Sequence, residues 1–183
     1  MELIIILVAL VGALALIFLA IFNRLVRQRN RVDNAWSQVD VQLRRRYDLI
    51  PNLVETVKGY AAHERQTFEE VVAARTAAQQ ASGVEAQAEA EGILGSVLRR
   101  LFALAEQYPE LRASENFQRL QGDLSDTENK IAVARQIYND TVLTYNNTTQ
   151  VVPSNIVALL TGFKPRPFFE VADEARGVPE VRF

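Results

Sequence analysis

An uninterrupted apolar run near the N-terminus constrains this chain more than any other feature. From Leu3 to Phe22, twenty consecutive positions carry no charge; fifteen are Leu, Ile, Val or Phe, four are Ala and one is Gly12. A helix of that length is ~30 Å long, which matches the hydrocarbon core of a bilayer. Each large apolar side chain favours insertion by roughly 0.3 to 0.6 kcal/mol, and no buried charge opposes it. The run predicts a transmembrane anchor over residues 1–23.

The flanks of the run bear on its fate and its orientation. A cleaved signal peptide is the alternative, but it needs a basic start and a cleavage site followed by polar sequence, whereas Glu2 precedes the run and Ala13-Leu14-Ala15 is followed by more apolar residues. After the run come four arginines expected to contact lipid headgroups: Arg24, Arg27, Arg29 and Arg31. By the positive-inside rule they place the N-terminus outside and the rest of the chain in the cytoplasm.

Composition excludes much of catalytic chemistry. The chain has no Cys and a single His, His63, which removes disulfides, Cys-ligated zinc, thiol nucleophiles and His-rich metal sites. His63-Glu64 lacks the second His of the zinc pattern H-E-x-x-H, and a diiron bundle would need a Glu three residues before the His. We therefore expect no enzyme activity, no metal and no cofactor, and we interpret His63-Glu64 as part of a turn.

Heptad spacing predicts two long helices. From Arg24 to Tyr60 apolar residues recur at helical spacing, and Pro51 predicts a kink rather than an end. A second pattern runs from residue 115 to Pro153, and between the two lie shorter helices near residues 68–75 and 93–108. This predicts an all-α chain in which the transmembrane helix continues into an antiparallel, coiled-coil-like, up-down four-helix bundle over residues 24–152. We call the heptad positions the seam: Trp36, Leu43, Ile50, Val57, Phe117, Leu124, Ile131, Tyr138 and Tyr145.

Two further stretches between the long helices differ in what they can bury. Residues 76–92 are mostly Ala, Gln, Glu and Gly, so they have helix propensity but little to bury, and we expect fraying there. The stripe from Ile93 to Tyr108 is so wide that contact from two sides, and hence self-association, is expected.

Polar clusters on the helices admit a structural and a functional interpretation. Arg44-Arg45-Arg46 could bind anions, but Asp40 and Asp48 lie four residues from Arg44, so ion pairing is favoured and nucleic-acid binding is not expected. The asparagines beside Tyr138 and Tyr145, Asn139 and Asn146, could line a ligand site between helices; a buried network that fixes helix register is favoured.

Residues 153–183 form a third segment. Ile156 to Phe169 is too short to span a bilayer but apolar enough to need cover, either by capping the open end of the bundle or by contact with a partner or membrane. If the helices alternate in direction, this segment returns to the membrane, with headgroup contacts from Lys164, Arg166, Phe168 and Phe169. Residues 172–183 are expected to be a loose tail.

Short motifs along nearly the whole chain resemble those of the LemA family of bacterial membrane proteins. They include Asn30 to Trp36, Val39 to Val54, Tyr108-Pro109, Glu115-Asn116-Phe117, Thr127-Glu128-Asn129, Tyr138-Asn139, Tyr145-Asn146 and Pro153-Ser154-Asn155. The resemblance implies an N-terminal anchor in the bacterial cytoplasmic membrane and a four-helix up-down bundle. It implies no catalytic residues, because the family has no agreed molecular function.

The sequence leaves three candidate functions. The first is a non-enzymatic, single-pass scaffold that forms a homo-oligomer on the lipid bilayer and organises membrane or envelope partners. The second is an adaptor or regulator of a membrane protease or sensor kinase in envelope stress, which requires a stable complex with an unidentified membrane protein. An enzyme, the third, lacks the necessary side chains.

Overall fold

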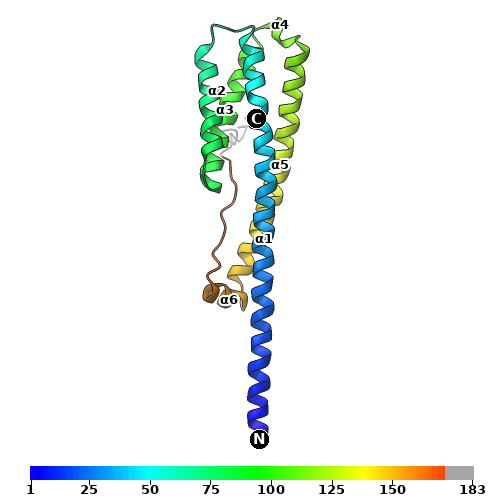
Figure 1. The fold of residues 1–183 in the computed structure, drawn as a ribbon, viewed down its shortest axis with the longest axis vertical. Coiled ribbons are helices and arrows are strands. Elements are labelled where there is room, and N and C mark those ends of the chain that lie inside the picture. Colours follow the sequence, from blue (N-terminus) through cyan, green and yellow to red (C-terminus); the bar gives the residue numbers. More distant parts are fainter. Residues whose placement is uncertain (172–183) are drawn as a thin grey trace, which may run out of the picture. The chain divides into compact units, whose positions relative to one another are not determined.

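The computed structural model describes residues 1–171, and within them the chain is all helical, without a strand. The described helices, labelled in Figure 1, are α1 (Glu2–Lys58), α2 (Arg65–Gln80), α3 (Val84–Ala105), α4 (Pro109–Arg112), α5 (Glu115–Gln150) and α6 (Ser154–Thr161). The all-α class is confirmed, and so is the continuity of the apolar run with the helix after it. The predicted tail, residues 172–183, lies outside the described residues.

Helix boundaries follow local sequence signals. α1 passes through Pro51 without ending and stops at Lys58, where Gly59 leads into the predicted turn. Pro109 does more than end a helix: it occupies the first turn of α4, where its missing N–H costs nothing. The C-cap of α6 is Gly162, whose φ of +77° is a left-handed conformation that glycine adopts without strain.

Contacts divide the chain into two compact units, and α1 and α5 each pass through both. The first unit comprises Met1–Val39 and Ala134–Pro167; the second comprises Asp40–Val133 and, of the described residues after it, 168–171. The functional division of the chain at residues 23 and 152 stays a prediction.

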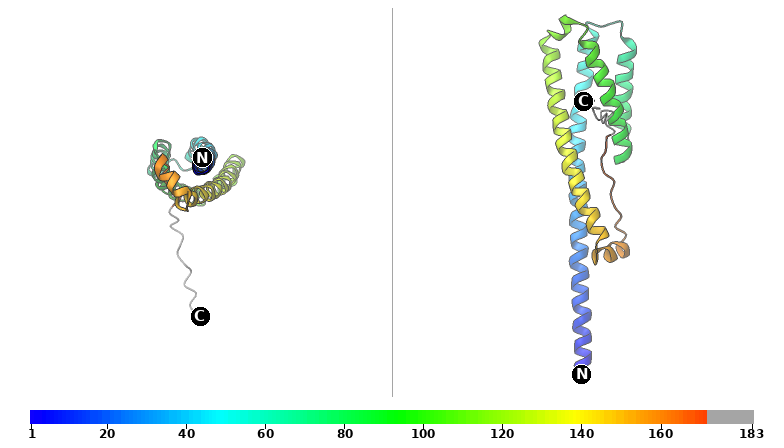
Figure 2. Two further views of the ribbon diagram at one scale, coloured as in Figure 1. Left: turned by 90° about the horizontal axis from the view of Figure 1, so that it is seen from below. Right: turned by 180° about the vertical axis from the view of Figure 1, so that it is seen from behind.

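In the first unit α1 and α5 lie side by side, as Figures 1 and 2 show. The Trp36 ring packs on that of Tyr138, with centroids 5.2 Å apart. Val32, Val142 and Tyr145 are buried with them, at 2%, 0% and 1% exposure.

The second unit corrects the prediction for residues 76–92. Apart from the break at residues 81–83, these residues belong to α2 and α3, which pack against each other, and Ala78 and Ala88 are buried. Small side chains let two helix axes approach closely, so a stretch with little bulk still forms a contact. The wide stripe of α3 is buried within one chain, except for Ile93, which is 53% exposed, and partly buried positions such as Phe102, whose ring lies 6.2 Å from that of Phe117. The breadth of this stripe therefore no longer argues for self-association.

Candidate functional site

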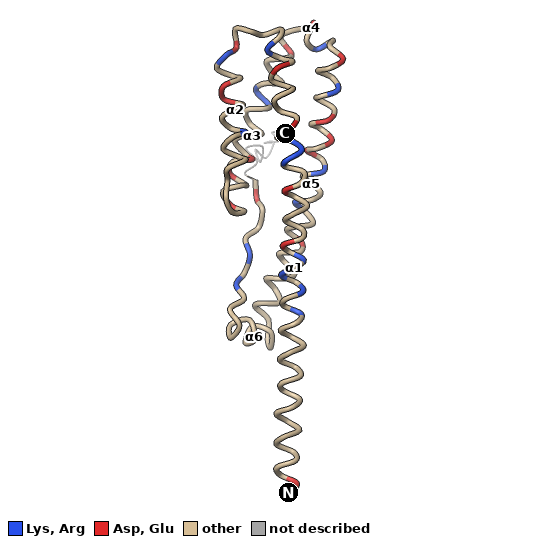
Figure 3. Tube along the Cα trace, viewed as in Figure 1, with Lys and Arg blue, Asp and Glu red and all other residues tan. Residues whose placement is uncertain are grey.

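The end of the apolar run in α1 receives the last described helix of the chain. Val157 and Ala158 of α6 are buried against Leu25 of α1. The Phe163 ring lies 5.8 Å from that of Phe22, edge to face, and the Arg29 guanidinium lies 5.3 Å from the Phe163 centroid. Figure 3 shows that the first basic positions of α1 begin near α6, while the stretch before them carries no charge back to Glu2. α6 is thus seated where the apolar run of α1 ends.

The opposite face of α6 is apolar and uncovered. Ile156, Leu159 and Leu160 are 55%, 83% and 71% exposed. They stand three and four positions apart, so they share one side of the helix. Val157 and Ala158, which hold α6 on α1, lie on the other side. The first unit therefore presents three large apolar side chains beside the end of the apolar run.

Polar side chains of α5 hold the extended segment after α6. Tyr145 and Tyr138 donate hydrogen bonds to the carbonyls of Lys164 (2.9 Å) and Pro167 (3.0 Å). Asn146 makes two bonds to Arg166, donating to its carbonyl and accepting from its N–H, both at 2.8 Å. The sequence predicts a network that fixes helix register. It misses that Tyr138, Tyr145 and Asn146 also bind residues 164–167 of the same chain. Burial raises the pKa of the Tyr145 hydroxyl, so it stays a donor.

The structure separates the residues predicted to contact headgroups into two groups. Seven of them are exposed, namely Phe168 and the six cations Arg24, Arg27, Arg29, Arg31, Lys164 and Arg166. Arg166 also pairs with Asp33 at 3.1 Å. The prediction is wrong for Phe169, which is fully buried, whereas Phe168 is 37% exposed. Successive side chains of an extended segment point to opposite sides, so adjacent phenylalanines cannot both face lipid.

The seam residues are mostly buried. Leu43, Ile50 and Val57 on α1 are 2%, 0% and 0% exposed, and those on α5, Phe117, Leu124, Ile131, Tyr138 and Tyr145, are 1% to 7% exposed. Trp36 is half-buried. The coiled-coil nature of the seam stays a prediction.

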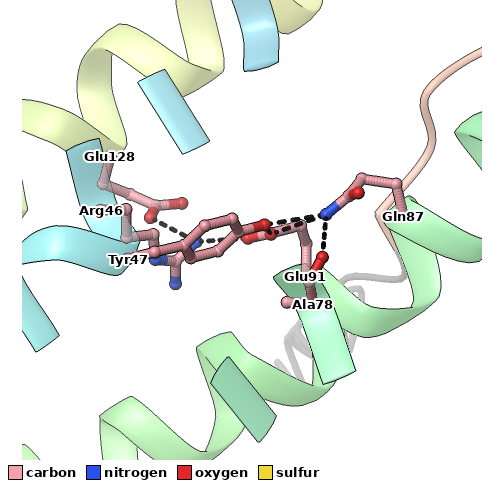
Figure 4. Close-up of polar contacts among 6 residues, drawn as sticks. All are labelled: Arg46, Tyr47, Ala78, Gln87, Glu91 and Glu128. Carbon is pink, nitrogen blue, oxygen red and sulfur yellow. Dashed lines mark hydrogen bonds and ion pairs between the residues drawn. The ribbon is translucent and has the colours of Figure 1, made fainter. Parts of the chain in front are cut away.

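A buried polar network in the second unit joins α1, α2, α3 and α5 (Figure 4). Nη1 of Arg46 lies 3.1 Å from carboxylate oxygens of Glu91 and of Glu128. The Tyr47 hydroxyl donates to Glu91. Nε2 of Gln87 lies 2.8 Å from the Tyr47 hydroxyl, 3.0 Å from the carbonyl of Ala78 and 3.2 Å from Glu91. Arg46, Tyr47, Gln87 and Glu91 each have at least one partner from another helix.

Burial governs the protonation of this network. It raises the pKa of the Glu91 carboxyl, against the hydrogen bond from Tyr47 and the charge of Arg46, which lower it. Burial, with the bond to Glu91, also raises the pKa of the Tyr47 hydroxyl. The arrangement therefore keeps Tyr47 a proton donor, and it serves to tie helices together.

The sequence prediction for the arginine run is correct only in part. Arg44 pairs with Asp40 at 2.9 Å, as its spacing predicts. Arg46 instead pairs with Glu91, which lies in the Ala-rich stretch. No local sequence pattern identifies a partner that is 45 residues away. Among the described residues no three His, Asp or Glu side chains gather as a metal site would require.

One protein-family model matches most of the chain. The family model described as the LemA family matches residues 35–183. The chain belongs to the LemA family. Among curated relatives, Magnetosome protein MamQ 1 of Paramagnetospirillum magneticum is 28% identical over 175 residues, and Magnetosome protein MamQ of Magnetospirillum gryphiswaldense is 28% identical over 174. Each match covers 81% of this chain and 64% of the relative.

A further relative carries the family's own name. Protein LemA of Metamycoplasma hominis is 24% identical over 153 residues, a match that covers 81% of this chain and 68% of the relative. This LemA-family chain thus spans less than two thirds of the length of the MamQ proteins. In its described part α1 is the one helix long and apolar enough to cross a membrane, and none of its apolar window is buried.

Proposed function

We propose that this LemA-family protein is a non-enzymatic scaffold on the bacterial cytoplasmic membrane. Residues 1–23 span the bilayer with the N-terminus outside, residues 24–152 form an antiparallel up-down four-helix bundle in the cytoplasm, and residues 153–183 form a membrane-proximal segment. The protein self-associates and organises membrane or envelope partners. Contacts of Arg46, Tyr47 and Glu91 among α1, α3 and α5, and the contact of Gln87 with α2, support the bundle.

The position of α6 carries this proposal. An exposed apolar face beside the end of a bilayer-length helix lies where hydrocarbon begins, if α1 spans. Full burial of one Leu or Ile side chain is worth roughly 1.5 to 3 kcal/mol, so Ile156, Leu159 and Leu160 together supply a substantial attraction to lipid. Each exposed cation near an anionic leaflet adds on the order of 1 kcal/mol. The chain would thus hold the membrane both by a spanning helix and by an interfacial one.

The charge pattern supports the cytoplasmic assignment of the bundle. Arginines follow the apolar run at residues 24, 27, 29 and 31, and no basic residue precedes it. Cytoplasmic flanks of spanning helices are enriched in Lys and Arg, and this bias sets orientation. A scaffold also accords with a polar network whose charged groups pair with one another across helices.

A single-cysteine fluorescence experiment tests the proposal. The natural chain has no Cys, so a Cys placed at Leu160 of the full-length protein carries a polarity-sensitive dye at one position only. In liposomes the emission should shift to the blue relative to the same dye at Val72, an exposed apolar residue of α2 that is 51% exposed. Emission from position 160 that stays as water-exposed as that from position 72 would contradict an interfacial α6.

Purification in mild detergent with measurement of the complex mass tests the scaffold itself. Multiples of the chain's own 20.6 kDa are expected. A stoichiometric complex with one different membrane protein would instead favour an adaptor or regulator of a protease or sensor kinase.

A further inference from the structure

The pair formed by α1 and α5 in the first unit has two grooves, and the chain itself covers one of them. Residues 163–167 lie along that groove, where Phe163 meets Arg29, Arg166 meets Asp33 and the backbone bonds to Asn146. The second groove is lined by Gln28 and Arg31 of α1 and by Ile137, Asp140, Thr141 and Thr144 of α5, around a cavity of about 270 Å³.

Helix geometry places these grooves on opposite sides. A helix turns about 100° per residue, so Arg31 and Asp33 point about 200° apart on α1. Ile137 and Asn146 are nine positions apart on α5, which separates their directions by about 180°. The second groove is therefore a distinct surface, on the side of the helix pair away from residues 163–167.

The second groove contains groups that its own chain leaves incomplete. Ile137 is 46% exposed. Gln28 is only 8% exposed, and its side-chain oxygen Oε1 is buried without a hydrogen-bond donor. Arg31 and Asp140 are both exposed, and within the described part of the chain neither forms an ion pair. The hydroxyls of Thr141 and Thr144 already donate hydrogen bonds to backbone carbonyls of α5, so they need no acceptor from a second copy.

We propose that this groove is the contact surface between two copies of the chain, in which Arg31 of each copy pairs with Asp140 of the other. The proposal rests on the self-association in the proposed function and names its surface. A groove that carries one unpaired cation and one unpaired anion is complementary to itself. A two-fold interface needs that property, because residue i then meets j while j meets i.

Membrane anchoring makes such a pairing geometrically natural. Copies inserted in the same direction are related by an axis along the membrane normal, so residues meet at equal height. Arg31 and Asp140 line one cavity and therefore lie at similar heights along the α1 and α5 pair. Ile137 lines the same cavity and supplies an apolar side chain for the contact. The guanidinium of the second copy has five N–H donors in a planar fork, which suits the Asp140 carboxylate.

Charge reversal with complementation tests the proposal on the full-length protein in detergent, by sedimentation. Arg31→Glu places two carboxylates against each other, and Asp140→Arg two cations, so each variant alone should dissociate at least tenfold more readily than the wild type. An equimolar mixture of the two variants should restore wild-type association, because both contacts then join opposite charges. This recovery cannot arise from pairing inside one chain. Arg45→Glu, at another exposed position of α1, should associate normally.

The outcomes separate this proposal from the scaffold function. If the wild type associates but the single variants do so equally well, or the mixture fails to recover, the groove is not the interface and self-association stands. If the wild type is a monomer at all accessible concentrations, both self-association and the assigned surface are refuted.

Discussion

Removing the Arg46 guanidinium gives a sharp test of the buried network. The side chain is 8% exposed, and its Nη1 lies 3.1 Å from Glu91, whose own side chain is 3% exposed. Arg46→Met keeps the bulk of the stem but leaves Glu91 with only Tyr47 and Gln87 as donors. Breaking a buried ion pair by removing one partner costs roughly 3 to 5 kcal/mol, because the other charge is stranded.

Protonation sets a ceiling on this cost. A Glu with an unfolded pKa near 4.3 can be neutralised at pH 7 for about 4 kcal/mol and at pH 5 for about 1 kcal/mol, at ~1.4 kcal/mol per pH unit. In the variant the folded pKa of Glu91 is raised further above its unfolded value. The folded state then holds a proton that the unfolded state releases, so stability is lost as the pH rises from about 4.3 toward the folded pKa. The wild type shows the same direction more weakly, because Arg46 favours the ionised form.

Urea unfolding of the full-length protein in detergent, followed by far-UV circular dichroism at pH 5 and pH 7, measures these losses. Arg46→Met should lose about 3 to 4 kcal/mol at pH 7 and about 1 kcal/mol at pH 5. Adding Glu91→Gln should return most of the loss at pH 7. The matched control Arg100→Met breaks an exposed pair with Glu70 and should cost less than about 1 kcal/mol. An equal loss at both pH values, or a double variant no more stable than Arg46→Met, would refute the reasoning.

Four further outcomes are expected. Phe163→Ala removes the ring that packs on Phe22, so amide exchange in α6 should accelerate at least tenfold while that of α2 and α3 is unchanged. Asn146→Ala removes the acceptor of the Arg166 N–H, whose exchange should accelerate, at a stability cost of about 1 kcal/mol. Leu43→Asp buries an unpaired charge and should unfold the second unit. Glu85→Ala, at an exposed position, should lower the free energy of unfolding by less than about 0.5 kcal/mol. Equal melting temperatures for the two variants would disprove the burial argument. A Cys at position 2 should react with an impermeant thiol reagent on intact cells and a Cys at position 114 should not; the reverse labelling would overturn the orientation.

Features that repeat along the chain were predictable from sequence. The buried faces of α1 and α5 can be recognised from sequence, because apolar residues recur every seven positions: Leu43, Ile50 and Val57 on α1, and Leu124 and Ile131 on α5. That spacing identifies the buried face of a helix without identifying the helix it packs against. Glu91 shows the limit of such reasoning. It is one of three glutamates in an Ala-rich stretch, and nothing in the local pattern distinguishes it from Glu85 and Glu89. Its burial depends on Arg46 and Tyr47, which reach it only after the helices pack.

The C-terminal segment shows a signal that sequence does carry, though only in combination. Pro165 and Pro167 have no N–H, and each disfavours helical geometry in the residue before it, so Lys164 to Pro167 must be extended and rich in unpaired carbonyls. Such a segment needs donors from elsewhere. Tyr138, Tyr145 and Asn146 supply them from one face of α5, bonding the carbonyls of Pro167, Lys164 and Arg166 in turn. The polar residues of α5 therefore fix the path of the segment that follows α6. Together with the packing of Phe163 on α1, they hold the apolar face of α6 beside the end of the apolar run of α1.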